Sequence, residues 1–338
     1  TVFTYTFTEP DKVYFAHTFP YTYSDLQRYL VFLEQDRRIA LVRRRKILCT
    51  TLAGNRCDLL TITGPCSSIE ESNARPSIVL SARVHPGEAM ASYMMHGMID
   101  FLTSEAPEAQ QLRQRYIFKI IPMLNPDGVI HGNYRCSLAG ADLNRKYQSK
   151  AITCYPTIIA IKNLLYRTHK SRGVALYLDL HGHSKKKNAF IYGCDYNRQP
   201  EKWKAETVLS KDEANSQRVY TRLFPYMLSR MSDIDKKYSH FSFPDCCFGV
   251  SKSKAGTGRV VAWRDIAIPA AYTIEMSFCG PGNNKEISML RKATKILGRQ
   301  AYAESRDNGV NTQTSSKATS TKLSTTTTNT SGSGSGDE

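Results

Sequence analysis

The most regular feature of the sequence is a series of short apolar runs rich in β-branched residues, a pattern typical of buried strands. These runs lie at residues 57–63, 78–84, 115–124, 174–180 and 270–278. After the second run the apolar spacing becomes helical, at Met90, Tyr93, Met94, Met98 and Phe101. Strands that alternate with helical segments predict the α/β fold class.

Other segments extend this prediction along the chain. We expect a helix at residues 24–36 with Ser24 as its capping residue, and further helices at 157–165, 207–232 and 285–305. The polar stretch at 66–76 is expected to be a loop, and NPDG at 125–128 a turn. Residues 241–265 are expected to form a loop followed by a strand.

Changes in composition predict three parts. Residues 1–23 alternate aromatic and polar side chains, as half-buried strands do, and we interpret them as the end of a truncated N-terminal β-rich domain. The main domain is expected at 24–305. Residues 306–338, rich in Thr, Ser, Asn and Gly, cannot bury apolar surface and are expected to be disordered. Because Thr1 is not an initiator methionine, we expect the sequence to begin inside a longer protein.

Composition and charge narrow the class of protein. Hydrophobic residues make up 41% of the 338, which suffices for a sizeable core. The nine cysteines are odd in number and form no CxxC pair, so we expect reduced thiols in a cytoplasmic protein. No apolar run approaches the roughly 20 residues that span a bilayer. The net charge of +16 favours an acidic partner. The RRRK run at 43–46 is expected to be a solvated charged segment, since no aromatic or glycine-rich context suggests a nucleic-acid site.

Two histidines and a glutamate form a candidate metal site. His85 follows the second apolar run, and Glu88 comes three residues later, at the start of the next helix. An imidazole nitrogen and a carboxylate oxygen suit zinc, although such a pair alone is a weak signal. His181 follows the fourth run in the same way, and the carboxyl ends of strands in an open α/β sheet share one edge. His183 is an alternative third ligand, because residues two apart in a strand point to the same side.

A polar loop and a carboxylate in a strand are further candidates. The loop at residues 131–147 has little apolar periodicity but carries Arg135, Asp142, Asn144 and Arg145. Glycine-rich polar loops of this kind often carry function. Glu275 lies inside the last apolar run, where an ionisable side chain is costly to bury without a partner or a role.

Six motifs in order, HPGE, NPDG, GNYR, ADLNR, LDLHGHS and YTIEMSF, resemble those of the cytosolic carboxypeptidase family, zinc metallocarboxypeptidases that remove glutamates from tubulin and other proteins. The resemblance covers residues 2–297. It implies a mixed central sheet with helices on both faces, preceded by a β-sandwich domain of which only the tail is present. Polyglutamylated or glutamate-ended protein tails, tubulin among them, are then the expected partners, without nucleic acid or membrane. The expected location is the cytoplasm, in association with microtubules.

The resemblance also assigns the catalytic roles. His85, Glu88 and His181 become the ligands of one Zn²⁺ ion, and the family pattern favours His181 over His183. Glu275 becomes the general base that moves a proton from water to the leaving amine.

Substrate-binding roles follow from the same resemblance. Arg135 is expected to polarise the scissile carbonyl, and Asn144 with Arg145 to bind the terminal carboxylate. Asp142 is expected behind His85, where it fixes the ring tautomer. Arg259 lies 16 residues before Glu275 (275 minus 259) and is expected to bind the side chain of a C-terminal glutamate.

The family pattern leaves some positions open. Gly87 stands where secreted relatives carry an arginine, and no tyrosine takes the place of the mobile one in the digestive enzymes. Residues 185–187 add three lysines, which either attract acidic tails or are simply solvated.

Two other functions are compatible with parts of the sequence. A related acylase would keep the metal site and cleave small N-acyl amino acids, but the Asn144 and Arg145 pair favours a peptide terminus. A non-catalytic module that binds acidic tails or microtubules would be favoured by loss of a metal ligand or of Glu275, and none is lost. Nucleic-acid binding is suggested by net charge alone.

Overall fold

The computed structural model describes residues 4–280 except 8, 11, 41–42, 207–208, 235–239 and 279. These residues belong to one compact unit. The helix expected at 285–305 and the disordered tail expected at 306–338 lie outside the described residues.

The described residues form a seven-stranded mixed sheet in the order β1-β2-β4-β3-β5-β7-β6. Strands β4, β3, β5 and β7 are parallel, whereas β1 and β2 at one side and β6 at the other are antiparallel to their neighbours. The bounds are β1 Arg43–Thr50, β2 Arg56–Ile62, β3 Ser77–Ala82, β4 Ile117–Ile121, β5 Val174–His183, β6 Ala189–Tyr192 and β7 Ala271–Ser277. All five runs expected to be strands are therefore strands of this sheet.

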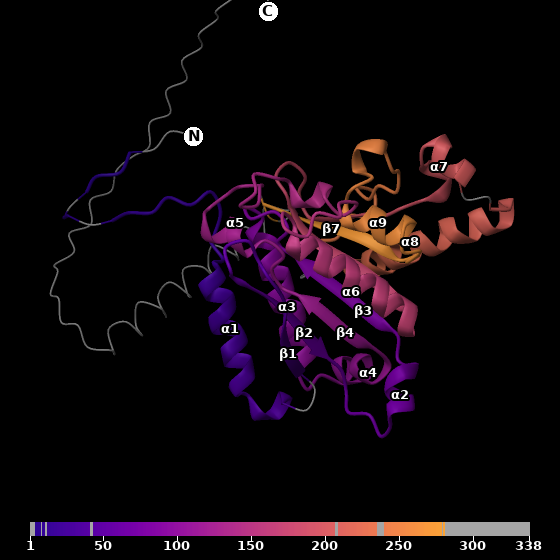
Figure 1. Cartoon of the computed structure of the whole chain (residues 1–338), viewed down its shortest axis with the longest axis horizontal. Coiled ribbons are helices and arrows are strands. Elements are labelled where there is room, and N and C mark those ends of the chain that lie inside the picture. The colour runs from indigo at the N-terminus through magenta and orange to yellow at the C-terminus, as the bar shows by residue number, and fades with distance from the viewer. Residues whose placement is uncertain are drawn as a thin grey trace, which may run out of the picture. The chain divides into compact units, whose positions relative to one another are not determined.

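Helices cover both faces of the sheet, because each central strand is apolar on both sides. Successive residues of a strand point to opposite faces, so Leu80 packs in one core with α1 (Tyr23–Gln35) and α3 (Ala89–Thr103). Its neighbour Val79 packs in the other with α6 (Pro156–Arg172) and α9 (Gly258–Arg264). Figure 1 shows α1 and α6 on either side of strands β1 to β4. The expected fold class is confirmed.

The remaining helices are short or peripheral. They are α2 Ile69–Ala74, α4 Pro107–Arg115, α5 Pro126–Ile130, α7 Glu201–Glu206, α8 Lys211–Ile234 and the 3-10 helices η1 Arg37–Ile39, η2 Leu143–Arg145, η3 Tyr196–Arg198 and η4 Lys252–Lys254. Among the described residues no helix is long and apolar enough to cross a membrane.

Some helix starts differ from expectation because turn and capping signals use the same residues. Thr22, not Ser24, caps α1, and it forms a capping box with Asp25. The NPDG turn is the first turn of α5, where the Asn125 side chain accepts a hydrogen bond from Gly128 N. The polar loop at 66–76 contains α2, which is capped by Ser68.

Two strand assignments also differ. The charged run at 43–46 begins edge strand β1, where the side chain of Arg45 is held by Asp58 at 2.8 Å and Glu34 at 3.2 Å. The strand expected before residue 265 is the helix α9, whose residues from Gly258 to Trp263 are all buried. A helix buried all round has no polar face, so its sequence lacks the helical alternation.

The N-terminal segment forms no strand in residues 4–7, 9–10 and 12–22. Several of its aromatic side chains are exposed, including Tyr14 and Phe19. The structure therefore does not show the β-rich segment expected at residues 1–23. A strand is stable only when its backbone groups form hydrogen bonds with a neighbouring strand.

We predict that Ile120→Ala lowers the free energy of unfolding by about 2 to 5 kcal/mol, because it leaves a cavity in the core. Ile120 is fully buried in β4, which lies between β2 and β3 in the sheet. The matched control, Ile69→Ala on α2, removes a side chain that is 75% exposed and should change stability by less than about 0.5 kcal/mol. Urea denaturation measures both, and equal effects would contradict the assigned core.

Candidate metal centre and active site

The edge formed by the carboxyl ends of β3 and β5 holds the candidate metal ligands. The two strands are parallel neighbours, with Ala82 opposite Leu180. His85 follows β3 by three residues, and His181 is the residue after Leu180 in β5. Glu88 occupies the capping position of α3, which begins at the next residue. The distant histidines are therefore brought together by the sheet register.

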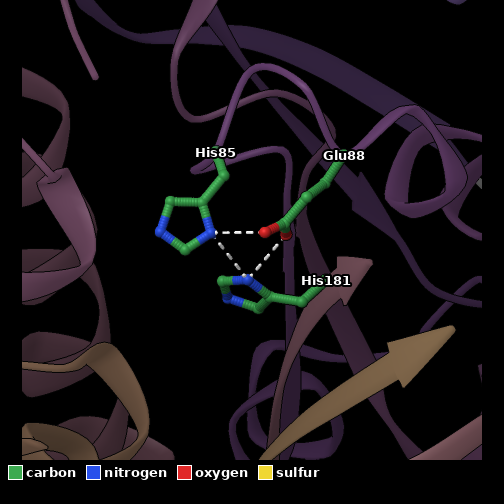
Figure 2. A group of neighbouring side chains, drawn as sticks. All are labelled: His85, Glu88 and His181. Atoms are coloured by element: carbon green, nitrogen blue, oxygen red, sulfur yellow. Dashed lines mark hydrogen bonds and ion pairs between the residues drawn. The ribbon is translucent and has the colours of Figure 1, made fainter. Parts of the chain in front are cut away.

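The three side chains converge on one point, as Figure 2 shows. His85 Nδ1 lies 2.7 Å from one oxygen of Glu88, His181 Nδ1 lies 2.9 Å from the other, and the two Nδ1 atoms are 3.2 Å apart. A tetrahedral zinc ion with ligands near 2.1 Å separates its donor atoms by about 3.4 Å. The donor set and spacing therefore fit a zinc ion, with only a slight opening of the cluster required. In the part of the chain that the structure describes, His85, Glu88 and His181 are the one group of three or more His, Cys, Asp or Glu side chains whose ligand atoms lie close enough together to hold a metal ion.

Each histidine is oriented by a carboxylate on its other nitrogen. Asp142 lies 3.1 Å from Nε2 of His85, and Asp179 lies 2.9 Å from Nε2 of His181. A carboxylate accepts a hydrogen bond, so each Nε2 carries the proton and each Nδ1 presents its lone pair to the centre. This arrangement of the tautomers is what two imidazoles need to bind one cation together.

The charges around the centre favour a cation. Burial acts to raise the pKa of Glu88, but His181 and His85 outweigh it and hold the pKa below its usual range. Burial acts to lower the pKa of His181, yet Asp179 and Glu88 raise it well above its usual value. The raised pKa of His181 means that the neighbouring carboxylates stabilise positive charge at this centre, and the lowered pKa of Glu88 means that its carboxylate stays ionised and can face a cation.

Asp179 was not among the residues expected from the sequence. It is fully buried in β5, two residues before His181 and on the same side of the strand, and it also accepts a hydrogen bond of 2.6 Å from Ser81 Oγ. Glu275 was identified from the sequence because a lone carboxylate is costly to bury in an apolar strand. The same argument applies to Asp179, so it could have been identified in the same way.

The alternative ligand His183 lies outside this group. Its Nδ1 accepts hydrogen bonds from the backbone N–H groups of Lys185 and Lys186, at 3.2 and 3.0 Å. Since that nitrogen is already engaged by the turn after β5, the geometry favours His181.

The turn that carries His85 is held by its own contacts. Arg83 has a left-handed φ of 58°, and its buried guanidinium donates to Pro86 O, Tyr21 O and Ser92 Oγ. Gly87 has no room for a side chain, because a Cβ there would lie 2.7 Å from Tyr134. The absence of an arginine at position 87 thus agrees with close packing against Tyr134.

Glu275 stands beside the metal group. It belongs to β7 and pairs directly with His181 of β5. Burial raises the pKa of Glu275 to about 7; to a smaller extent the charge of His181 lowers this pKa and the charge of Glu88 raises it. A carboxylate whose pKa lies close to neutral is suited to accept and return a proton.

The loop after α5 supplies the other polar groups. Arg135 is paired with Asp142, whose carboxylate lies 2.9 Å from Nε and 2.8 Å from Nη2 of the arginine. The side-chain oxygen of Asn144 accepts a hydrogen bond from Gly258 N at 3.0 Å, and its Nδ2 lies 3.4 Å from His181 Nε2. Arg145 Nη1 donates to the carbonyl oxygen of Asn144 at 2.8 Å. The network holds the loop against the metal group and α9.

A cavity of about 840 Å³ joins these residues. Arg259 of α9, only 6% exposed, faces it and donates to Gly193 O and Cys194 Sγ, while its buried Nε has no hydrogen-bond partner. Every expected site residue except Asp142, which lies behind His85, lines the cavity: His85, Glu88, Arg135, Asn144, Arg145, His181, Arg259 and Glu275. The lining also includes Arg198 and Lys254, which the sequence analysis did not single out.

Comparison with known proteins identifies the family. The zinc carboxypeptidase family model matches residues 37–297. The chain belongs to the zinc carboxypeptidase family. With a His-Glu-His group that can hold a metal ion, this membership confirms the zinc cofactor and the carboxypeptidase fold expected above.

The relatives at the sequence level are cytosolic carboxypeptidases, which confirms the resemblance. Cytosolic carboxypeptidase 2 of Mus musculus is 44% identical over 292 residues, 86% of this chain and 31% of the relative. Cytosolic carboxypeptidase 2 of Danio rerio is 46% identical over 270 residues, 80% of this chain and 34% of the relative. The chain therefore spans about a third of the length of these relatives.

Solved structures give the same fold at greater distance. A metallo-carboxypeptidase from Burkholderia cenocepacia has a TM-score of 0.59 and 22% identity, covering 77% of this chain and 61% of that one. A putative carboxypeptidase A from Shewanella denitrificans has a TM-score of 0.60 and 25% identity, with the same coverage.

We predict that Asp179→Asn weakens zinc binding about 10- to 100-fold, because His181 loses the charged acceptor that fixes its tautomer. A competitive chelator titration of the metal-free protein measures the dissociation constant. Asp212→Asn, a change at an exposed position on α8, is the control and should leave it unaltered. Unchanged affinity in a folded Asp179→Asn protein would refute the orienting role.

Proposed function

We propose that the chain is the catalytic part of a zinc metallocarboxypeptidase that removes glutamates from acidic C-terminal tails or polyglutamate side chains of proteins such as tubulin. The observation that carries this proposal is the position of Arg259, buried in the wall of the cavity that also contains the metal group and Glu275. In the described part of the chain Arg259 forms no ion pair with a carboxylate, so its charge is available to an acidic side chain.

The arrangement supports hydrolysis of a terminal peptide bond. When bound, zinc acts as a Lewis acid that makes water a nucleophile near neutral pH. Glu275 accepts the proton of the attacking water on its carboxylate and passes it to the amine that leaves. Arg135 donates hydrogen bonds to the carbonyl oxygen as negative charge develops there.

Arg145 and Asn144 bind the free carboxylate of the last residue, which restricts cleavage to the chain end. The planar guanidinium of Arg145 suits this task, because it forms two parallel hydrogen bonds with a carboxylate. A second carboxylate, on the side chain of a terminal glutamate, then reaches Arg259. An N-acyl glutamate carries the same two carboxylates, so these cations do not separate the acylase alternative from a peptidase; the match to carboxypeptidases favours a peptide substrate.

The names of the relatives call them cytosolic, which supports a cytoplasmic location for this protein. The net charge of +16 supports an acidic partner such as the tubulin tail, in the cytoplasm and along microtubules.

We predict that Glu275→Gln lowers kcat for glutamate release by about 10²- to 10⁴-fold, since the amide cannot accept the proton. Zinc content should not fall, because Glu275 is outside the ligand group. The assay measures glutamate released from polyglutamylated tubulin and from a polyglutamate-tailed peptide, with chelated protein as a second inactive sample. Glu201→Gln, a change at an exposed ion pair on α7, is the control.

Two results would contradict this proposal. Full activity of Glu275→Gln would remove the general base from the mechanism. If zinc-loaded wild-type protein released no glutamate but bound the tails, the function would be that of a binding module.

We predict that Arg259→Gln lowers kcat/KM for a glutamate-ended peptide by about 30- to 1,000-fold, which corresponds to about 2 to 4 kcal/mol for a buried charge contact. The same change should spare a peptide that ends in leucine. Arg264→Gln is the matched control, because Arg264 lies on the same helix but pairs with Glu206 outside the cavity. A parallel loss on both peptides would mean that Arg259 supports the fold and does not select the substrate.

A further inference from the structure

A line of polar side chains runs along β5 and ends at the metal group. Tyr177, Asp179 and His181 are two residues apart, so they point to the same side of the strand. Val79, opposite Tyr177 in the register, shares this face, which packs against α6 and α9 in a largely apolar core. Tyr177 and Asp179 are completely buried. Polar groups in such a core are costly unless they are hydrogen-bonded.

A serine from β3 connects these side chains. Ser81 is opposite Asp179 in the parallel register and is also completely buried. Its Oγ donates to one oxygen of Asp179 at 2.6 Å and lies 3.1 Å from the hydroxyl oxygen of Tyr177. The other oxygen of Asp179 lies 2.9 Å from Nε2 of His181. The four side chains, Tyr177, Ser81, Asp179 and His181, form a continuous hydrogen-bonded series that we call the polar column.

The hydroxyl protons of the polar column have one possible direction. A carboxylate only accepts hydrogen bonds, so the single hydroxyl proton of Ser81 is used on Asp179. Ser81 then accepts the proton of Tyr177. Burial raises the pKa of Tyr177, and the charge of Asp179 acts in the same direction, so this hydroxyl keeps its proton. Asp179 therefore accepts from Ser81 on one oxygen and from His181 on the other.

Close packing surrounds the polar column. Gly258, the first residue of α9, lies directly against it, because a Cβ there would be 2.9 Å from the hydroxyl oxygen of Tyr177. In such a buried place, a hydrogen bond lost from Asp179 is not replaced by one from solvent. The orientation of this carboxylate therefore depends on the hydroxyl groups that precede it in the column.

We propose that Ser81 and Tyr177 are positioning residues of the metal centre, which fix the Asp179 carboxylate so that it orients His181 for zinc. Ser81 acts on the carboxylate directly, and Tyr177 acts through Ser81. Neither residue belongs to the metal group or to the cavity lining. The inference concerns zinc binding and does not depend on the proposed specificity for glutamate.

The test measures the zinc dissociation constant of the full chain by competition with a chelator. Ser81→Ala should raise this constant about 3- to 10-fold, because it removes one hydrogen bond to the carboxylate but leaves the carboxylate in place. Tyr177→Phe keeps the ring and removes only the hydroxyl, so it should raise the constant about 2- to 5-fold. Because the two variants are independent, failure of one to fold leaves the other as the test.

Each variant has a matched control. Ser77→Ala removes a hydroxyl from the same strand that is equally buried but has no hydrogen-bond partner in the described part of the chain. Tyr272→Phe removes a buried hydroxyl from β7, which donates to Thr221 O at 3.1 Å on the other side of the sheet. Both controls should leave the constant within about twofold of the wild-type value. Equal losses in the variants and their controls would overturn the proposal.

A double variant shows whether Ser81 acts through Asp179. In Asp179→Asn protein, the further change Ser81→Ala should alter the zinc dissociation constant by less than about twofold, because the carboxylate that it positions is already absent. If the losses from the two changes simply multiplied, Ser81 would act by another route and the proposal would be wrong.

Nuclear magnetic resonance reports the orientation of the ring directly. In zinc-loaded protein with isotope-labelled histidine, the Nε2 proton of His181 should move to higher field in Ser81→Ala, as its hydrogen bond to a less firmly held carboxylate lengthens. The Nε2 proton of His85 faces Asp142, outside the polar column, and should not move. An unchanged His181 signal in folded Ser81→Ala protein would refute the proposal. These measurements need no substrate, so they remain decisive even if the protein releases no glutamate.

Discussion

The parallel register of β3, β5 and β7 is the constraint on which the site depends. Backbone hydrogen bonds place Ser81 opposite Asp179 and His181 opposite Glu275. A slip of one residue in β5 would turn His181 to the other face of the sheet, away from Glu88. Such a slip is costly because both faces are packed against helices, so every apolar side chain of the strand would also change faces. The core that stabilises the fold therefore also sets the geometry of the metal group.

The buried charges at this edge stabilise one another. Asp179 is fully buried, and its oxygens accept from Ser81 Oγ and lie beside His181 Nε2. Glu88 meets both imidazoles, and its second oxygen also accepts from Gly182 N at 3.0 Å. Removing any one member would leave a buried partner unpaired, which costs more than the pair contributes. The cluster is thus a unit, and a bound cation would balance the negative charge of the three carboxylates, Glu88, Asp142 and Asp179, that contact the two rings.

The sequence predicted what depends on local pattern. The central strands were predictable because burial on both faces makes them continuous apolar runs, and His85 and His181 because each follows such a run. The helix α9 and strand β6 were not, since α9 is buried all round and β6 is only the four residues Ala189–Tyr192. The presence of Arg198 and Lys254 in the cavity lining depends on how two loops lie against the cavity, which only tertiary packing determines.

The cationic side chains show why net charge alone could not locate the substrate site. Most basic residues of such a chain lie on the surface, where solvent screens them and where they carry little specificity. Arg259 differs, because its burial deprives the guanidinium of water while its Nε has no hydrogen-bond partner. That state lowers the stability of the free protein, since an unpaired buried charge is costly. A carboxylate that entered the cavity would relieve this cost, which is the physical reason for assigning the proposed glutamate specificity to Arg259.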